Sequence, residues 1–302
     1  MIYQRERTGE KKKEHRCKSI TRNAMTSLYW ALTVYVLKVF LMTQALLAYD
    51  GQTFPEGLRK PSHGNVYVVA HRGVHDSIPE NTLSAYQKAI DLGCDFIEID
   101  VRTTLDSQLV SIHDATIDRY SNQGEKGRVA DMTFEQLRSI DIGSRVDSRW
   151  RHERVPSVRE ILQLCRGKIG VYLDVKAAKL DELVSIVREF GMEQDTLWYI
   201  PPNKVDELRL LSDYVWPMPD PGPERYLSEL LTLRNPRVVA SAWKHFSLDF
   251  GKRCHDHGAI VIVDEGERSS WSPMLDFGAD GIQTDHPEEL IKFLGKRSQD
   301  PK

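Results

Sequence analysis

Residues 66–101 read VYVVAHRGVHDSIPENTLSAYQKAIDLGCDFIEIDV, and this stretch decides the fold class. Its two ends, Val66–Ala70 and Phe96–Val101, are short runs rich in apolar and β-branched residues, which is typical of buried strands. Between them, Thr82–Leu92 repeats apolar residues at the spacing of an amphipathic helix. A strand, a helix and a second strand in this order predict a unit with two parallel strands.

The same alternation continues to the end of the chain and predicts a TIM-type (β/α)8 barrel over residues 65–296. Further helices are expected at Leu180–Phe190 and Ser247–His257, and Thr133 and Ser157 have capping-box spacing. The strand candidates are Val66–Ala70, Phe96–Val101, Leu109–His113, Gly170–Val175, Thr196–Ile200, Tyr214–Met218, Val238–Ala242, Ile260–Val263 and Gly281–Thr284. They exceed the eight strands of a barrel by one, and Val238–Ala242 is the candidate for the surplus piece. An open doubly wound sheet is the alternative, although no glycine-rich nucleotide motif favours it.

The N-terminal part has the order of a targeting segment. Eight basic residues against three acidic ones precede residue 23, and an apolar run follows from Met25 to Ala48. This order predicts a signal peptide or a membrane anchor over residues 1–48, and both place the domain outside the cytoplasm, periplasmic, secreted or membrane-anchored. Lys38 disfavours a span, and Met25 could itself be the start. We expect a linker over residues 49–64 and a short tail over residues 297–302.

Composition excludes several classes of protein. The 302 residues carry a net charge of −3, so no overall basic character suggests nucleic acid as a partner. The basic cluster precedes the apolar run, and basic residues in that position typically set the orientation of a segment in the membrane. The four cysteines, Cys17, Cys94, Cys165 and Cys254, form no close pair, which argues against zinc and redox motifs. We expect the last three to be buried core residues.

Four polar clusters fall at predicted strand ends, the side of a barrel that carries active sites. Glu98 and Asp100 stand two residues apart, so both carboxylates face the same side of their strand. Asp174 and Lys176 repeat this spacing on a later strand. Buried carboxylates that converge need a cation, and oxygen ligands favour Mg²⁺ or Ca²⁺ over zinc.

The other two clusters supply acid–base and phosphate-binding groups. His71 and Arg72 end the first strand, and His113 with Asp114 follows a later one. Two histidines at separate strand ends can serve as general acid and general base. Arg72 offers a planar fork for a phosphate, and Lys176 offers a point charge for developing negative charge.

The run from Ala70-His71-Arg72-Gly73 through Pro79-Glu80-Asn81-Thr82 and Glu98-Ile99-Asp100 to His113-Asp114 resembles the glycerophosphodiester phosphodiesterase family. The resemblance continues at Val155-Pro156-Ser157-Val158 and at Gly281–Pro287, and spans roughly residues 66–294. It is dense up to Lys176 and sparse from there to Gly281.

This resemblance implies roles for particular residues. His71 and His113 match the catalytic histidines, Arg72 and Lys176 the phosphate-binding residues, and Glu80 and Asn81 a turn near the substrate. Glu98, Asp100 and Asp174 match the ligands of a divalent cation. It implies hydrolysis of a small glycerophosphodiester to sn-glycerol 3-phosphate and an alcohol, in which the substrate's own 2-hydroxyl can be the nucleophile. Which histidine is the acid stays open.

The chain departs from the family pattern in three places. Asp174 stands where the family usually has a glutamate, so its reach to a cation is shorter by one methylene. Ile262–Glu265 replaces a run that usually contains an aromatic residue, which removes an aromatic wall of the pocket. The proline-rich segment Trp198–Pro223 is unusual, and we expect it to shape the pocket for the alcohol.

Two other functions remain open from the sequence. A phospholipase or sphingomyelinase D-like enzyme that acts on lipids such as lysophospholipids would use a related barrel, two histidines and acidic ligands, and Asp174 suits it. A surface-displayed binding barrel without activity would keep the motif. Turnover discriminates between these readings, whereas metal binding does not.

Overall fold

The computed structural model describes residues 54–264 and 266–298, which include nine strands. The strands are β1 Tyr67–Ala70, β2 Phe96–Thr103, β3 Leu109–Ser111, β4 Gly170–Ala177, β5 Thr196–Ile200, β6 Trp216–Pro219, β7 Val238–Ala242, β8 Ile260–Asp264 and β9 Gly281–Thr284. The helices are α2 Leu83–Leu92, α3 Phe134–Arg138, α4 Val158–Cys165, α5 Leu180–Glu189, α6 Val205–Leu211, α7 Leu227–Arg234, α8 Leu248–Asp256, α9 Trp271–Asp276 and α10 Pro287–Arg297.

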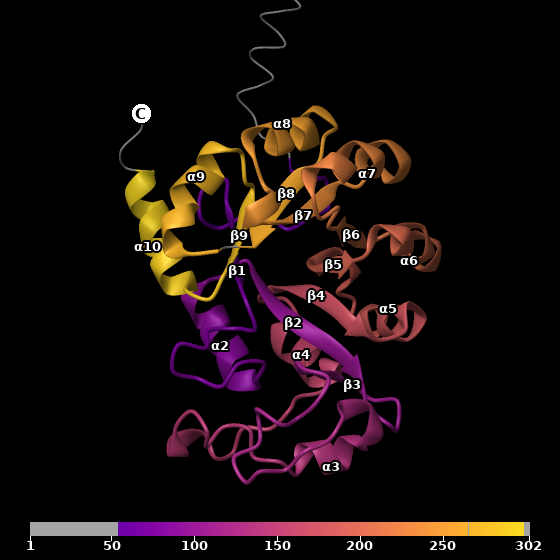
Figure 1. Ribbon diagram of the computed structural model, residues 1–302, viewed down its shortest axis with the longest axis vertical. Coiled ribbons are helices and arrows are strands. Elements are labelled where there is room, and N and C mark those ends of the chain that lie inside the picture. The colour runs from indigo at the N-terminus through magenta and orange to yellow at the C-terminus, as the bar shows by residue number, and fades with distance from the viewer. Residues whose placement is uncertain (1–53, 265, 299–302) are drawn as a thin grey trace, which may run out of the picture. The chain divides into compact units, whose positions relative to one another are not determined.

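Eight of these strands form one parallel sheet that closes into a TIM-type barrel. The order is β6-β5-β4-β2-β1-β9-β8-β7, and the two end strands, β6 and β7, lie beside each other. Helices surround the strands on the outside, as Figure 1 shows. The carboxyl ends of all eight parallel strands therefore meet on one side of the barrel, which is where its functional residues are expected.

The surplus strand is β3, and the prediction that Val238–Ala242 is the extra piece is wrong. Val238–Ala242 is the barrel strand β7, paired in parallel with β8. The strand β3 pairs antiparallel with β2 and lies off the barrel. Only Thr104–Gln108 separates β2 from β3, and a parallel connection needs a dozen residues or more, so an antiparallel hairpin is the only possibility.

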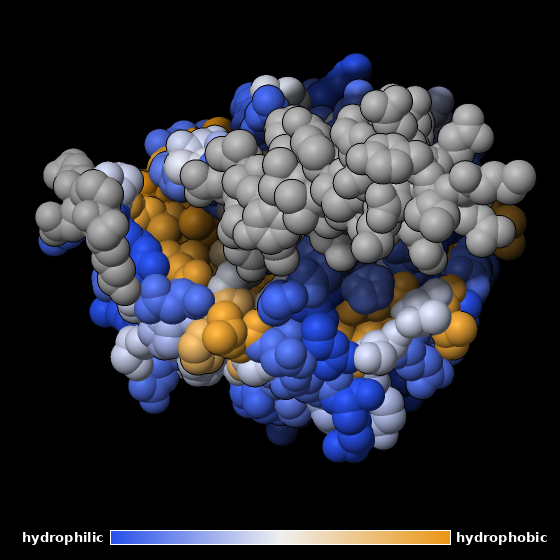
Figure 2. Space-filling view, turned by 90° about the horizontal axis from the view of Figure 1, so that it is seen from above, coloured by the Kyte–Doolittle hydropathy of each residue, from blue (hydrophilic) through white to orange (hydrophobic). Residues whose placement is uncertain are grey.

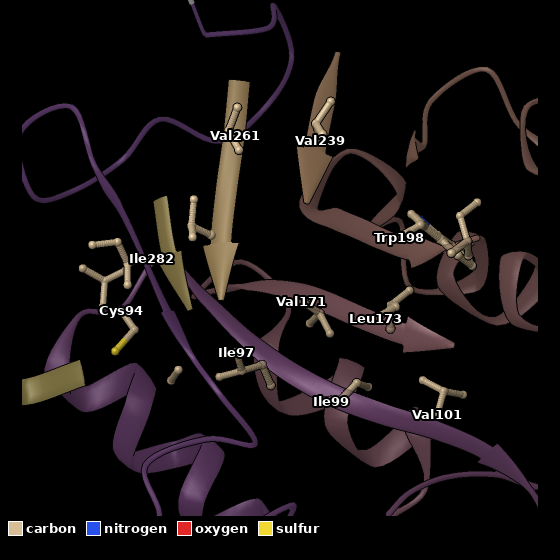
Figure 3. Packing of buried hydrophobic residues seen from close by; sticks show 14 of the residues in the cluster. Cys94, Ile97, Ile99, Val101, Val171, Leu173, Trp198, Val239, Val261 and Ile282 are labelled. Atoms are coloured by element: carbon tan, nitrogen blue, oxygen red, sulfur yellow. The ribbon is translucent and has the colours of Figure 1, made fainter. Parts of the chain in front are cut away.

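The core has one layer inside the barrel and one between the barrel and its helices. Tyr67, Val69 and Phe96 belong to the inner cluster, and Val68 and Ile97 to the outer one, because successive side chains point to opposite faces of a strand. Figure 3 shows the outer layer, with side chains from β2, β4, β7, β8 and β9. Figure 2 shows one outer face, where hydrophilic residues predominate and apolar residues form smaller patches.

Local sequence signals are confirmed within one or two residues. Thr82 caps α2 by accepting a hydrogen bond from the Ala85 amide. Thr133 with Gln136 and Ser157 with Glu160 form the predicted capping boxes. Cys94, Cys165 and Cys254 are free and buried, as expected for small core residues.

The described part of the predicted linker packs against the barrel. Leu58 is buried in the inner cluster, and the Phe54 ring meets the Tyr67 ring edge to face with centroids 5.3 Å apart. The predicted leader over residues 1–48 lies outside the described residues. Within residues 54–264 and 266–298, no helix combines the length and apolar composition that a membrane span requires.

Candidate active site

Three carboxylates meet because of the register between β2 and β4. Asp100 is the direct partner of Asp174 in this parallel pair, and Glu98 lies two residues before Asp100 on the same face. One carboxylate oxygen from each of the three residues lies within 4.8 Å of the others. Glu98 and Asp100 are almost fully buried, whereas Asp174 is partly exposed. The predicted ligand set is therefore a real cluster.

This cluster has the electrostatics of a cation site. Burial raises the pKa of Glu98 well above its usual value, and the neighbouring charges of Asp100 and Asp174 raise it further. Burial also raises the pKa of Asp174, although Lys176 opposes the shift. Only oxygen atoms converge, which suits a hard divalent cation. The residues present therefore fit a divalent ion.

Lys176 and Arg72 are the two basic side chains next to this cluster. Lys176 Nζ lies 2.5 Å from Asp174 Oδ2 and 3.3 Å from Asp100 Oδ1. Arg72 Nε lies 3.4 Å from Asp100 Oδ2. Burial lowers the pKa of Lys176, but attraction to Asp174 outweighs it, and the net pKa is raised. Both side chains stay charged beside the pocket and can bind a phosphate.

The turn after β1 aims the backbone of Arg72 at the cluster. Arg72 has a left-handed conformation, with φ of 53°, and its amide donates a 2.8 Å hydrogen bond to Glu98 Oε2. Such a conformation costs roughly 1–2 kcal/mol for a residue with a side chain. The next residue, Gly73, has φ of 79°, and a Cβ there would lie 2.8 Å from the backbone of Ala85. The turn therefore packs tightly against the start of α2 and is held in place.

Glu80 and Asn81 lie behind the pocket rather than in its wall. The Asn81 side-chain amide donates a 2.8 Å hydrogen bond to Asp100 Oδ2. Glu80 accepts from Arg72 at 3.1 Å and from Arg119 at 2.7 Å. Burial raises the pKa of Glu80, but these arginines outweigh it and hold the pKa at about 2. Both residues position charged groups of the site, and neither lines the pocket itself.

His71 is oriented by a residue that is distant in the sequence but follows the neighbouring strand β9. Asp285, directly after β9, lies 2.6 Å from His71 Nδ1 and 3.0 Å from His75 Nε2. Burial raises the pKa of Asp285, but its hydrogen bonds with the two histidines outweigh this and hold the pKa far below the usual range. The ionised Asp285 accepts a hydrogen bond from the protonated Nδ1 of His71. This leaves His71 Nε2 as the nitrogen available for proton transfer.

His113 has a similar support on the other side. Its Nδ1 lies 2.7 Å from Asp114 Oδ1, and Arg119 Nε donates to Asp114 Oδ2 at 2.7 Å. Burial raises the pKa of Asp114, but Arg119 and His113 outweigh it and hold the pKa at about 2. Both histidines therefore have a carboxylate on Nδ1, an arrangement that orients the ring and suits general acid–base catalysis.

One pocket of about 270 Å³ brings these groups together. His71, Arg72, His113, Asp174 and Lys176 line it, with Glu98 and Asp100 buried beside them. The second half of the barrel adds residues that the sequence analysis did not select as site residues: Tyr199, Asp220, Ser241, Asp264 and Gln283. Two of these come from the proline-rich segment that we expected to shape the pocket.

Sequence reasoning also missed the supporting residues. His75, Asp285, Asp114 and Arg119 hold the catalytic candidates but have no regular spacing relative to them. Asp114 stands next to His113 in the sequence and Asp285 lies within the closing motif Gly281–Pro287, yet only the fold brings Asp285 to His71.

Comparisons with known proteins identify the family of this chain. The profile of the glycerophosphoryl diester phosphodiesterase family matches residues 71–212. A glycerophosphodiester phosphodiesterase of Caldanaerobacter subterraneus is 31% identical over 248 residues, which cover 76% of this chain and 98% of the relative. One from Bacillus altitudinis is 30% identical over 244 residues, covering 75% of this chain and 97% of the relative.

Solved structures show the same fold. A glycerophosphodiester phosphodiesterase from Agrobacterium tumefaciens superposes with a TM-score of 0.68 at 25% identity, covering 75% of this chain and 99% of that one. An Oleispira antarctica phosphodiesterase, solved in complex with the product sn-glycerol-3-phosphate, has a TM-score of 0.68 at 19% identity. The match covers 76% of this chain and 96% of that one. The matched profile and the near full-length relatives establish that this chain belongs to the glycerophosphodiester phosphodiesterase family of phosphoric diester hydrolases.

Proposed function

We propose that the protein hydrolyses glycerophosphodiesters to sn-glycerol 3-phosphate and an alcohol, with a divalent cation and two histidines. The observation that carries the proposal is the single pocket that brings His71, His113, Arg72 and Lys176 next to the three clustered carboxylates. Relatives that match this chain over nearly their whole length are glycerophosphodiester phosphodiesterases.

Glu98, Asp100 and Asp174 would hold the cation, Mg²⁺ or Ca²⁺. When bound there, the ion supplies positive charge to a phosphate oxygen. Arg72 and Lys176 bind the remaining phosphate oxygens, and their charge stabilises the extra negative charge of the transition state. Asn81 and Glu80 keep Asp100 and Arg72 in place through the hydrogen bonds described above.

The histidines move the protons. One takes a proton from the attacking hydroxyl, either water or the substrate's own 2-hydroxyl, while a new bond forms to phosphorus. The other gives a proton to the alcohol oxygen as its bond to phosphorus breaks. If the 2-hydroxyl attacks first, the resulting cyclic phosphate is opened by water with the two roles exchanged. Asp285 and Asp114 stabilise whichever imidazole is protonated.

Turnover of glycerophosphocholine tests this proposal. We expect the folded protein to release glycerol 3-phosphate, detected by a coupled enzyme assay, to lose activity in EDTA and to regain it with added Mg²⁺ or Ca²⁺. Activity that is unchanged by EDTA would show that the mechanism does not use a cation. No release from folded protein would favour first a lysophospholipid or sphingomyelin substrate, tested in the same sample, and then a binding barrel.

We also propose that the domain works outside the cytoplasm, on the basis of the order of basic and apolar residues before Ala48. A signal peptide or anchor over residues 1–48 would leave the barrel, residues 65–296, on the far side of the membrane. Fractionation of cells that express the full chain with a C-terminal tag tests this. Recovery of all the protein in the cytoplasm would refute it.

A further inference from the structure

The pocket has two sides of different chemical character: one combines the carboxylate cluster with basic side chains, and no basic residue of the pocket lining lies on the other. His71, Arg72 and Lys176 supply cationic groups or proton donors on the side of β1 and β4. Tyr199, Asp220, Asp264 and Gln283 come from β5, the end of β6, β8 and β9, and line the opposite part. A phosphodiester placed against Arg72 and Lys176 would therefore extend one of its two substituents toward acidic and hydrogen-bond-accepting groups.

Asp220 is a charged acceptor on this second side. It follows β6 directly, accepts a 3.1 Å hydrogen bond from the Tyr199 hydroxyl and accepts one from the Gly222 amide at 2.6 Å. These contacts fix the carboxylate without neutralising it. In the part of the chain that the structure describes, no basic side chain forms an ion pair with Asp220. Its negative charge is therefore available to a ligand in the pocket.

Gln283 provides an independent sign that a ligand binds here. Its side chain is 7% exposed, and its Nε2 donates a 3.2 Å hydrogen bond to Asp264 Oδ1. Because an ionised carboxylate can only accept, the amide nitrogen must face Asp264 and the amide oxygen must face elsewhere. That oxygen, Oε1, is buried and has no hydrogen-bond partner among the described residues. Gln283 lines the pocket, so a small rotation of its side chain would bring this buried, unpaired acceptor to a ligand that carries a donor.

Two tyrosine rings from neighbouring strands lie where the two sides meet, Tyr172 on β4 and Tyr199 on β5. The rings of Tyr172 and Tyr199 lie with centroids 6.0 Å apart and an angle of 35° between their planes. Both side chains line the pocket next to Asp174 and Asp264. Aromatic faces attract cations, and more strongly where water is excluded. This pair provides an aromatic surface in a chain that lacks the family's usual aromatic residue near Ile262.

These groups select among possible alcohols. An acidic substituent would be repelled by Asp220 and Asp264. A neutral polyol would use the hydrogen-bond acceptors but not the charge or the aromatic faces. A primary ammonium uses all three, because it is positive and can donate an N–H to Gln283 Oε1. The pocket volume of about 270 Å³ suits a short polar group better than an acyl chain.

We propose that Asp220, Asp264 and Gln283 make this enzyme selective for glycerophosphodiesters whose leaving alcohol carries a primary ammonium, such as the 2-aminoethyl group of glycerophosphoethanolamine. The inference rests on the proposed function, since it places the phosphate of that reaction between Arg72 and Lys176. It assigns the second half of the barrel to recognition of the alcohol.

The test compares kcat/KM of the full-length protein for glycerophosphoethanolamine, glycerophosphocholine and neutral glycerophosphoglycerol. We expect the ethanolamine diester to exceed the glycerol diester by about tenfold or more, the order of one charge-assisted contact. Asp220→Asn and Asp264→Asn keep the side-chain shape but remove a charge, and each should reduce this preference severalfold. Asp213→Asn, an exposed aspartate in the loop before β6, is the matched control and should leave the preference unchanged.

Gln283→Met tests the donor requirement separately. It removes the acceptor Oε1, so the ethanolamine diester should lose rate while glycerophosphocholine, which has no N–H to donate, should not. Ratios between substrates within one variant cancel any loss of folded protein. Equal rates for all three diesters in the wild type, or variants that slow all three equally, would overturn the selectivity. No release from any diester would overturn the proposed function, and this inference with it.

Discussion

The two halves of the barrel differ in how they contribute to the pocket. The half from β1 to β4, residues 67–177, carries every residue that the sequence marked for chemistry, within motifs shared with the family. The half from β5 to β9, residues 196–284, contributes the Tyr199 ring and several acceptors, of which only Gln283 lies in a motif shared with the family. Under the proposed function, the first half would carry out the reaction and the second half would select the alcohol.

The largest expected effect lies in the first half. We expect His71→Ala and His113→Ala each to lower kcat by at least about 10², the low end of the effect of a general acid or base. The assay is steady-state turnover of glycerophosphocholine. His152→Ala, an exposed histidine between α3 and α4, is the control. A loss below tenfold for either site variant would remove that histidine from the mechanism.

The next effect concerns Asp174, the carboxylate that is one methylene shorter than the family's usual glutamate. Asp174→Asn should raise the divalent-ion concentration needed for half-maximal activity by roughly 10–100-fold, because one of three charged oxygen ligands is lost. The fold should survive, because Asp174 is partly exposed at its strand end. Titration of activity with Mg²⁺ and Ca²⁺, alongside thermal unfolding, separates the two outcomes. An unchanged half-activation point would place the third ligand elsewhere.

Asp285 tests whether the second half contributes only selectivity. It follows β9 but contacts His71, so Asp285→Asn should lower kcat by about tenfold or more and alter the pH profile, with little change in preference among diesters. His255→Gln is a matched control, because His255 forms a comparable pair elsewhere in the barrel. Its Nε2 lies 2.9 Å from Oδ2 of the buried Asp280, and neither residue lines the pocket. A changed substrate ratio with an unchanged pH profile would contradict the positioning role.

The smallest expected effect is on stability and concerns Glu80. Its pKa falls from 4.5 to about 2 on folding, so its stabilisation is present above pH 4.5 and is lost as the pH falls toward 2. Glu80→Gln should therefore lower the free energy of unfolding near neutral pH by roughly 1–3 kcal/mol. Denaturant unfolding at pH 7 and pH 3 checks this. The difference between the variant and the wild type should be clearly smaller at pH 3 than at pH 7, and an equal difference at both pH values would exclude the charge as the cause.

The barrel and the first half of the site could be predicted because they depend on local patterns. The two-residue spacing of Glu98 and Asp100 fixes a common face, and the strand–helix alternation fixes parallel pairing. The identity of the surplus strand could also have been derived, since five residues between β2 and β3 cannot carry a parallel connection. The remaining features depend on which strands become neighbours and in what register.

Gln283 illustrates that limit. In the sequence it is one polar residue in a closing strand, equally compatible with a solvated position. The fold places it on the inner face of the barrel, pairs it with Asp264 of the neighbouring strand and leaves its amide oxygen without a partner among residues 54–264 and 266–298. Such a residue becomes informative only when its neighbours from other strands are known.

The pair of His71 and Asp285 joins residues 214 positions apart in the chain. The His71 amide also donates a hydrogen bond to the carbonyl oxygen of Thr284, at the end of the last strand. Contacts of such long sequence separation form late in folding, because a large loop must close first. A chain still being synthesised therefore has the first-half motifs early but cannot orient this histidine until β9 is in place. The timing of catalytic competence is thus tied to completion of the barrel, and partly made chains should be inactive even when most of the barrel has formed.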